Sequence, residues 1–230
     1  MPINISPNNC YNIDCLEGMR LMQEQGIKAD WCITDPPYGI GIEKMNFVKS
    51  GAKVIGKARR NDYTQTGDWD KERITQEYFD IMFDRADNQL IFGGNYYTDI
   101  LPPTKSWLVW DKRTPSKSDR NDFADCELAW VSKGVARVIN YLYNGMLQED
   151  MRGKEFRFHP TQKPSQMWIK VLGLYTKEND LILDPFAGSQ SLRIACHKTN
   201  RRYIGFEIDK EYYDKGCFWF NSASTQMAFF

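Results

Sequence analysis

The sequence predicts an α/β protein built on a largely parallel, doubly wound sheet. Short apolar segments rich in β-branched and aromatic residues alternate with stretches of helical period. Many of these apolar segments run into loops that contain glycine or proline. The length of 230 residues, with 42% hydrophobic and 26% charged residues, is that of one ordinary globular domain. Because such sheets bind ligands at the carboxyl ends of their strands, the loops after the strands are where function is expected.

The N-terminal half is expected to alternate strands with two helices. Leu16, Met19 and Met22 recur at helical spacing and give one helix an apolar face. Two consecutive prolines, Pro36 and Pro37, allow neither a helix nor a strand ladder, so the strand before them must end in a rigid loop. The strands are expected at 3–5, 31–34, 89–92 and 107–110, the helices at 14–25 and 74–86, and a mobile loop at 39–68.

The C-terminal half continues the same alternation, and we assign residues 1–230 to a single domain. Segments 127–132 and 137–143 are expected to form a hairpin or two consecutive strands. Further strands are expected at 181–183 and 203–206, and further helices at 165–175, 189–197 and 210–220.

Composition excludes several classes of protein. A formal net charge of zero argues against a protein that grips nucleic acid over its whole surface, but it allows a local basic face. No apolar run reaches the roughly 18 residues of a membrane span, and the N-terminus carries no secretion signal. Six scattered cysteines without a CxxC pair, and only two histidines, argue against a metal site and predict reduced thiols. A cytoplasmic protein is expected.

The most specific chemical signal is Asp35-Pro36-Pro37-Tyr38. An exocyclic amino group of a base is a poor nucleophile, because its lone pair is delocalised into the ring. The Asp35 carboxylate and the Pro36 carbonyl can accept both amino hydrogens and favour a nitrogen with a localised lone pair. Tyr38 offers a flat face on which an extruded base can stack. The alternative is a proline-rich turn that only ends a strand.

A second signal is the strand, turn and helix at 181–191, which contains Asp184-Pro185-Phe186-Ala187-Gly188-Ser189. Small residues let the backbone approach a ligand, and free N–H groups at a helix start attract a carboxylate such as that of S-adenosylmethionine. The pattern differs from GxGxxG, which argues against NAD and FAD. An ordinary strand–turn–helix connection is the alternative.

Two further segments complete the set. Glu207 ends a strand about 20 residues past the glycine turn, where a carboxylate can accept both hydroxyls of a cofactor ribose. Asp209 is expected to cap the following helix instead. The segment His159-Pro160-Thr161-Gln162-Lys163-Pro164 precedes a helix. Taken alone, its histidine is more typical of a hydrogen-bonded structural residue than of a catalyst.

In this order the four motifs resemble the β class of DNA amino-methyltransferases, which make N6-methyladenine or N4-methylcytosine. That family has a circularly permuted motif order, in which the catalytic loop precedes target recognition, HPTQKP and the cofactor loop. The resemblance covers residues 14 to about 213. It implies a class I methyltransferase fold: a Rossmann-like, mixed, seven-stranded sheet flanked by helices, with one antiparallel strand near the edge. It also implies S-adenosylmethionine as the cofactor.

The resemblance assigns roles position by position. The catalytic loop is Asp35, Pro36, Pro37 and Tyr38. Residues 14–15 match the pair beside the cofactor's adenine, and 159–164 match the segment beside its methionine moiety. The full cofactor-binding set that the resemblance implies is Asp14, Cys15, His159, Thr161, Lys163, Asp184, Phe186, Gly188, Ser189 and Glu207.

One position departs from the family pattern. The cofactor loop usually reads GSG, whereas this chain reads Gly188-Ser189-Gln190. A side chain at Gln190 would narrow the approach of the backbone to the cofactor or force a different turn. Because glutamine is tolerated in the first turn of a helix without strain, we expect cofactor binding to survive. Aspartate rather than serine before the two prolines resembles adenine-specific members.

DNA binding requires lysine and arginine against phosphates, and the basic part of the 39–68 loop is expected to order on DNA. A solvated surface loop is the alternative. A short target-recognition region is expected at about 112–158. The residues expected to contact DNA are Lys44, Lys49, Lys53, Lys57, Arg59, Arg60, Lys112 and Arg113.

The sequence therefore predicts a site-specific enzyme that flips an adenine out of duplex DNA and methylates its N6. The alternatives are N4 of cytosine in DNA, an RNA base, or an inactive DNA-binding module. A homodimer and a companion endonuclease of a restriction–modification system are left open.

Overall fold

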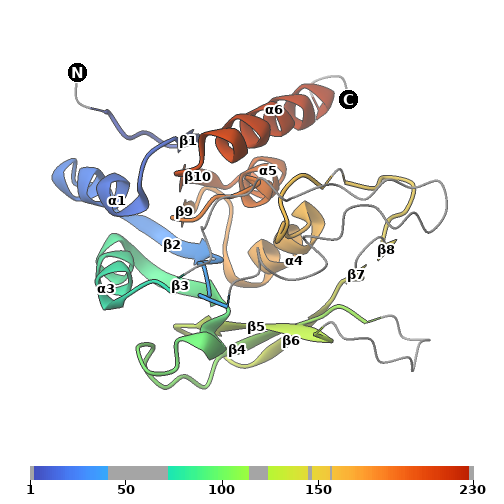
Figure 1. The fold of residues 1–230 in the computed structure, drawn as a ribbon, viewed down its shortest axis with the longest axis horizontal. Coiled ribbons are helices and arrows are strands. Elements are labelled where there is room, and N and C mark those ends of the chain that lie inside the picture. Colours follow the sequence, from blue (N-terminus) through green and yellow to red (C-terminus); the bar gives the residue numbers. More distant parts are fainter. Residues whose placement is uncertain (1–2, 41–71, 114–123, 145–146, 156, 228–230) are drawn as a thin grey trace.

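Figure 1 shows a twisted central sheet with helices on both of its faces. The computed structural model describes residues 3–40, 72–113, 124–144, 147–155 and 157–227. The sheet has eight strands in the order β1-β10-β9-β2-β3-β5-β4-β6, and β5 runs antiparallel to both of its neighbours. The predicted α/β class with a mixed, mainly parallel sheet is confirmed, with eight strands in place of the seven expected.

The bounds of the elements follow the predicted alternation closely. The strands are β1 (Asn9–Tyr11), β2 (Ala29–Thr34), β3 (Ala86–Phe92), β4 (Trp107–Asp111), β5 (Cys126–Val131), β6 (Arg137–Asn140), β9 (Leu181–Asp184) and β10 (Arg202–Phe206), with β7 (Tyr143–Asn144) and β8 (Leu147–Gln148) in a separate ribbon. The helices are α1 (Cys15–Glu24), α3 (Gln76–Arg85), α4 (Ser165–Tyr175), α5 (Ser191–Lys198) and α6 (Lys210–Met227), and η2 (Gly94–Tyr96) is a 3-10 turn.

Two hydrophobic clusters hold the layers together, one on each face of the sheet. Met19 of α1 and Phe79 of α3 are fully buried in one cluster, and Val171 of α4 and Ala195 of α5 are fully buried in the other. Because the central strands are covered on both faces, they are buried along almost their whole length, as in β9. The cores therefore fix which strands are central, and the central strands carry the loops of interest.

The order of the strands brings two distant loops to one edge. β2 pairs in parallel with β9, with Cys32 opposite Leu183, although about 150 residues separate them in the chain. β10 pairs in parallel with the other side of β9. Parallel neighbours end at the same edge of a sheet, only about 5 Å apart. The loops after β2, β9 and β10 must therefore lie side by side.

One expectation about strands was wrong, and the structure decides between two alternatives for another pair. Residues 3–5 are not a strand, because the backbone N–H of Ile5 donates to the Gln25 side chain (2.9 Å) and the first strand begins at Asn9. Of the two alternatives for 127–132 and 137–143, consecutive strands are observed: β5 and β6 do not form a hairpin, because β4 lies between them and pairs with both. Leu108 of β4 is fully buried, which agrees with a place for β4 inside the sheet. The local sequence does not tell which strands pair with β4.

Some expectations fall outside the described residues. Of the predicted mobile loop, only residues 39 and 40 are described. The predicted recognition region at 112–158 contributes β5 and β6 to the main sheet and β7 and β8 to the small ribbon, and residues 114–123, 145–146 and 156 are outside the description. In the described part of the chain, no helix is both long and apolar enough to span a bilayer. All six cysteines are free thiols.

Candidate active site

A cavity of about 380 Å³ lies at the carboxyl ends of β2, β9 and β10. Asp35 and Pro37 of the predicted catalytic loop line it, and so do Gly188 and Ser189 of the predicted cofactor loop. The two loops therefore open into one space, as the sequence-based hypothesis requires. The volume is within the range of roughly 300–1,000 Å³ that is typical of cofactor and ligand sites.

Both carboxylate oxygens of Asp35 have partners within the chain. The Tyr38 hydroxyl donates to Oδ1, and the Lys163 ammonium donates to Oδ2. Burial raises the pKa of Asp35, and the positive charge of Lys163 offsets part of that rise. The Tyr97 hydroxyl also donates to the Pro37 carbonyl and anchors the loop to the segment after β3. Asp35 is thus held from two sides in a rigid loop.

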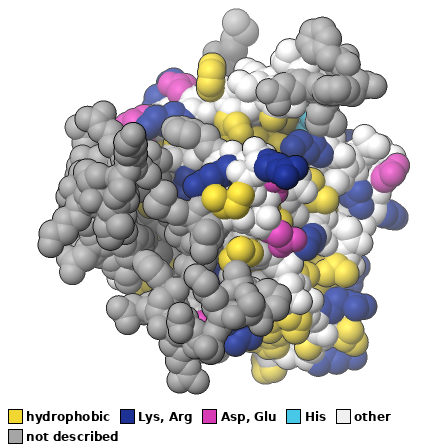
Figure 2. Space-filling view, turned by 90° about the vertical axis from the view of Figure 1, so that its right-hand side faces the viewer, with side chains coloured by type: hydrophobic (Ala, Val, Ile, Leu, Met, Phe, Trp, Pro, Cys, Tyr) yellow, Lys and Arg dark blue, Asp and Glu magenta, His cyan; other side chains and the backbone are white. Residues whose placement is uncertain are grey.

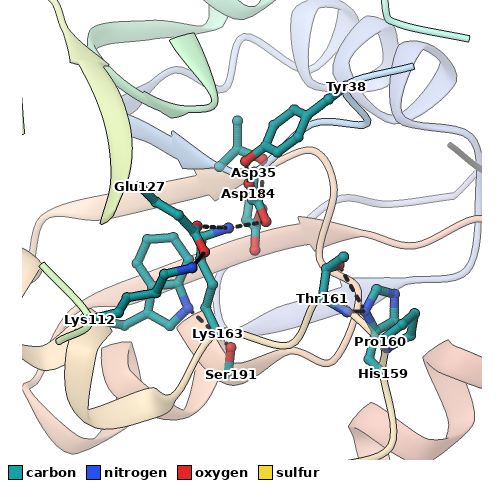
Figure 3. Close-up of polar contacts among 12 residues, drawn as sticks. Asp35, Tyr38, Lys112, Glu127, His159, Pro160, Thr161, Lys163, Asp184 and Ser191 are labelled. Atoms are coloured by element: carbon teal, nitrogen blue, oxygen red, sulfur yellow. Dashed lines mark hydrogen bonds and ion pairs between the residues drawn. The ribbon is translucent and has the colours of Figure 1, made fainter. Parts of the chain in front are cut away.

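Lys163 belongs to a chain of alternating charges that sequence reasoning did not predict. Its Nζ lies 3.2 Å from Oε2 of Glu127, and Oε1 of Glu127 accepts a hydrogen bond from Lys112 (3.1 Å). Figure 3 shows Lys163 between Asp35 and Glu127, with Lys112 on the far side of Glu127. The Lys163 side chain is only 6% exposed, so its ammonium depends on these two carboxylates.

The ring of Tyr38 is covered on one face by a neighbouring aromatic residue. Tyr96 of η2 stacks on it with the ring centroids 4.8 Å apart and the planes 19° from parallel. Gly93 lies against the Tyr38 ring, and a Cβ atom at this position would be 2.0 Å from it. Tyr38 was expected to offer a flat face to a base, and here its hydroxyl is bound to Asp35 while Tyr96 takes up one face of its ring.

Glu207 and the glycine turn are joined directly. Gly188 has a left-handed backbone (φ 49°), and its N–H donates to Oε2 of Glu207 (2.7 Å), while the Asp209 N–H donates to Oε1 (2.8 Å). Burial raises the pKa of Glu207 to about 7. The Asp209 side chain accepts the N–H groups of residues 211 and 212, so its expected role as the cap of α6 is confirmed.

Asp184, at the end of β9, forms hydrogen bonds with both neighbouring strands, β2 and β10. Its Oδ1 accepts the hydroxyl of Thr34 (2.9 Å) and its Oδ2 accepts the hydroxyl of Tyr203 (3.1 Å). Burial raises the pKa of Asp184 to about 7 despite these hydrogen bonds. Asp184 lines the cavity, but both of its oxygens are committed to neighbouring strands.

The HPTQKP segment reaches the cavity at two places. His159 lies beside the glycine turn, where a Cβ at position 188 would be 3.5 Å from its Nε2, and its ring packs on Tyr212 with centroids 4.3 Å apart. Burial lowers the pKa of His159 to about 3, so the imidazole is neutral at physiological pH. Thr161 also lines the cavity, and its hydroxyl lies 3.2 Å from Nδ1 of His159. Lys163, by contrast, directs its ammonium at Asp35.

The conformation of Gln190 differs from the one expected for the cofactor loop. Gln190 is not in an unstrained helical turn, because it precedes α5 with a left-handed backbone (φ 60°, ψ 24°). Its side chain is fully buried and lies away from the cavity, where Nε2 donates to the Tyr213 carbonyl (3.0 Å) and Oε1 accepts from Arg193 (2.9 Å). The glutamine therefore takes the backbone conformation that glycine usually supplies, and it does not narrow the cavity.

The remaining predicted residues line the same cavity and fit S-adenosylmethionine by their chemistry. Asp14 caps α1 through Oδ1, and Cys15 and Phe186 lie with it on the cavity wall. An aromatic ring and carboxylates suit an adenosine, and the left-handed turn at Gly188 allows close approach of the backbone. In the described residues no cluster of three or more His, Cys, Asp or Glu is placed to hold a metal ion.

Several lining residues were not predicted. Tyr78 of α3 packs near Phe186 with ring centroids 6.2 Å apart, and Trp168 of α4 donates through Nε1 to Ser191 (3.0 Å). These residues stand on helices whose apolar faces look like ordinary core in the sequence. Only the tertiary packing separates them from the rest of the core.

The predicted DNA contacts divide into two groups. Lys44, Lys49, Lys53, Lys57, Arg59 and Arg60 lie outside the described residues. Lys112 is paired with Glu127, and Arg113 is paired with Asp111 (2.8 Å). On the face in Figure 2, lysine and arginine side chains are interspersed with apolar and acidic ones. The described residues on that face therefore show mixed charge without one continuous basic patch.

Comparison with known proteins identifies the family. A family model for N6 and N4 methyltransferases, described as DNA methylase, matches residues 98–216 of this chain. Type II methyltransferase M2.DpnII of Streptococcus pneumoniae is 44% identical over 220 residues, which cover 80% of this chain and 79% of that protein. This chain belongs to the DNA methylase family. This DNA methylase is thus a DNA amino-methyltransferase with S-adenosylmethionine as its cofactor, within a family that covers N6 and N4 transfer.

Solved structures agree with the fold of this DNA methylase. The M1.HpyAVI–SAM complex superposes with a TM-score of 0.58 at 23% identity and covers 90% of this chain and 96% of that one. PvuII DNA methyltransferase, described as cytosine-N4-specific, superposes with a TM-score of 0.55 at 13% identity and covers 93% and 86%. The class I methyltransferase fold expected from the motifs is confirmed.

Proposed function

We propose that this DNA methylase transfers the methyl group to N6 of adenine in duplex DNA. The observation that carries the proposal is the single cavity lined by both Asp35 and the Gly188 turn. One space next to a fixed carboxylate can hold methyl donor and acceptor amine in line, and positioning of this kind supplies much of the rate of a direct transfer. Aspartate before the two prolines supports adenine as the target base.

In this proposal Asp35 acts on the amino group. One of its oxygens and the Pro36 carbonyl accept the two amino hydrogens, which localises the lone pair on nitrogen and stabilises the positive charge that develops there. Burial raises the pKa of Asp35, which suits a carboxylate that can hold the proton leaving the methylated nitrogen. Tyr97 anchors the loop through the Pro37 carbonyl and keeps the acceptors aimed.

At the other end of the cavity the chain would hold the cofactor. S-adenosylmethionine, when bound, supplies a methyl group on a positively charged sulfur. Asp14, Cys15 and Phe186 are proposed to contact its adenine, and Glu207 its ribose. His159 and Thr161 are proposed to lie beside its methionine part. Gln190 lies outside the cavity, which favours an active enzyme over an inactive binding module.

The first test replaces the proposed catalytic acid. Asp35→Ala is expected to abolish methyl transfer, because alanine offers no acceptor for the amino hydrogens, while calorimetry is expected to show cofactor binding within a few-fold of wild type. Asp87→Asn is the matched control. It alters an exposed carboxylate that pairs with Lys28 (2.7 Å) near the start of β3, at the opposite edge of the sheet.

The assay uses S-adenosylmethionine with a labelled methyl group, duplex DNA, and identification of the modified nucleoside after digestion. Labelled N6-methyladenine supports the proposal, and labelled N4-methylcytosine replaces it. Turnover retained by Asp35→Ala would refute the role of this carboxylate. Absence of cofactor binding by the wild type would point to the inactive module. A cytoplasmic location, a homodimer and a companion endonuclease stay predictions from the sequence.

A further inference from the structure

Each carboxylate oxygen of the acid at the centre of the proposed reaction already accepts a hydrogen bond, and one of the two donors is charged. Oδ1 of Asp35 is bound by the Tyr38 hydroxyl and its Oδ2 by the Lys163 ammonium. An incoming amino group needs one of these oxygens as an acceptor. Because an ammonium donates a stronger, charge-assisted hydrogen bond than a neutral amine, Lys163 would outcompete the substrate for Oδ2 unless a second acceptor for the ammonium lay nearby.

Glu127 offers such an acceptor. Its Oε2 is buried and forms an ion pair with the Lys163 ammonium, with 3.2 Å between Oε2 and Nζ. A buried carboxylate oxygen is costly unless a donor approaches it, so Oε2 favours a closer approach of this ammonium. The other oxygen is held by Lys112 at 3.1 Å, which fixes the carboxylate in this orientation.

The surroundings of Lys163 favour a low free-energy cost for a small movement of its ammonium from Asp35 towards Glu127. Its ammonium lies over the ring of Phe92, 4.8 Å from the centroid, so an apolar wall with affinity for a cation flanks the path between the two carboxylates. A shift from Asp35 to Glu127 leaves the net charge of the cluster unchanged. Figure 3 shows the ammonium already between the two acids.

Resting on the proposed function, we propose that Glu127 is a positioning residue that takes the Lys163 ammonium when a target amino group arrives. Oδ2 of Asp35 then becomes the acceptor for the amino hydrogen, and no covalent bond is made or broken in the exchange. Glu127 does not line the cavity, so it acts on the reaction through Lys163 alone. In this proposal Lys163 holds Oδ2 of Asp35 in the absence of a base and releases this oxygen in the presence of one.

The test compares Glu127→Gln, Lys163→Gln and the double variant by single-turnover methyl transfer at saturating cofactor and DNA, with Asp87→Asn as the carboxylate-to-amide control. Loss of a charge-assisted acceptor predicts a rate about 10- to 100-fold lower for Glu127→Gln, with an unchanged dissociation constant for S-adenosylmethionine. Without Lys163 there is no ammonium to relocate. The double variant is therefore expected to match Lys163→Gln within about twofold.

A merely structural role for Glu127 predicts otherwise. Defects that multiply in the double variant would overturn the inference, and so would a wild-type rate in Glu127→Gln. If Glu127→Gln alone fails to fold, the comparison of the double variant with Lys163→Gln still decides, because a further loss of tenfold or more overturns the proposal. A wild type that methylates no adenine refutes the proposed function itself, and this inference falls with it.

Discussion

Asp184 and Glu207 are two acids with a pKa raised to about 7 by burial, but their partners differ. Asp184 accepts hydroxyl groups from two strands of the sheet, whereas Glu207 accepts two backbone N–H groups beside the cavity. A carboxylate has about four acceptor sites, and because Glu207 is partly exposed whereas Asp184 is buried, Glu207 is the one whose remaining sites can reach the ribose hydroxyls of a cofactor. Equal pKa values at these two residues therefore predict different functional consequences.

Cofactor affinity is expected to depend on the ionisation of Glu207. In its proposed role the ionised carboxylate accepts both ribose hydroxyls, and the ionised fraction of Glu207 falls as pH drops below about 7. The association constant for S-adenosylmethionine, measured by calorimetry, is therefore expected to fall by about tenfold per unit between pH 6.5 and 5. Glu207→Gln is expected to bind weakly at every pH and to lose this dependence.

Asp184→Asn is the matched control, because it removes the other acid with a pKa of about 7 while leaving Glu207 in place. It is expected to keep the pH dependence. His159 is already neutral throughout this range and contributes nothing to it. A pH dependence that disappears in Asp184→Asn and persists in Glu207→Gln would reverse the two assignments.

At the level of elements, the packing of α5 against α6 explains how glutamine replaces a glycine in the cofactor loop. The Gln190 side chain enters α6 at Gly216, where an added Cβ would lie 2.7 Å from its Nε2. The bonds to Tyr213 and Arg193 hold the glutamine there and stabilise a left-handed backbone that costs about 1 kcal/mol or more for a residue other than glycine. Gln190 and Gly216 thus function as a pair.

This pairing predicts an effect of alanine with an unusual sign. Glycine to alanine inside a helix ordinarily stabilises by about 0.5–1 kcal/mol. Gly216→Ala is instead expected to lower the free energy of unfolding by about 1–3 kcal/mol, because the buried Gln190 cannot move aside. Gly173→Ala in α4, where an added Cβ meets no atom within 4 Å, is the control and is expected to stabilise. Urea denaturation measures all three proteins.

Gly216→Ala in a Gln190→Gly background tests whether the contact between these two residues causes the loss of stability. Without the glutamine side chain, position 216 has room for a methyl group, and the effect of Gly216→Ala on the free energy of unfolding should become neutral or stabilising. If Gly216→Ala is equally destabilising in both backgrounds, the contact with Gln190 is not the reason that glycine is needed.

At the scale of the whole molecule, the buried acids give the unliganded protein a distinctive pH profile. The pKa values of Asp184 and Glu207 rise from ordinary values of 3.8 and 4.5 to about 7, so the folded state binds more protons than the unfolded chain between these limits. Stability therefore falls as pH rises from about 4.5 to 7, by an amount on the order of a few kcal/mol. The lowered pKa of His159 opposes this trend below about pH 6.5 but is one group against two, and acids with a lowered pKa, such as Asp111, affect stability only below this pH range.

Urea midpoints of the cofactor-free protein at pH 5.5 and 7.5 test this expectation. The midpoint is expected to be higher at pH 5.5, opposite in direction to the cofactor affinity, because folding favours the protonated acids and the ligand favours the ionised Glu207. The Asp184→Asn/Glu207→Gln double variant should lose this difference or reverse it, because the buried His159, with a pKa of about 3, favours the higher pH. A wild-type midpoint that rises with pH would show that other groups dominate.

The local pattern of the sequence determined the elements and the chemistry of single loops. Helical spacing in 14–25, the two prolines after Thr34 and the glycine turn at 188 each depend on neighbours in the chain, so they can be read without a fold. The resemblance to a family added the order of the motifs and the cofactor. The roles assigned to individual site residues stay predictions.

The tertiary structure decided what depends on strand order and packing. It placed β2 beside β9, set β4 between β5 and β6, and turned Gln190 towards α6. It also brought Lys163 to Asp35 across 128 positions and set Glu127 beside both. Local sequence cannot encode such contacts, because the free energy that selects one strand partner or ion pair is summed over burial and charges supplied by distant parts of the chain.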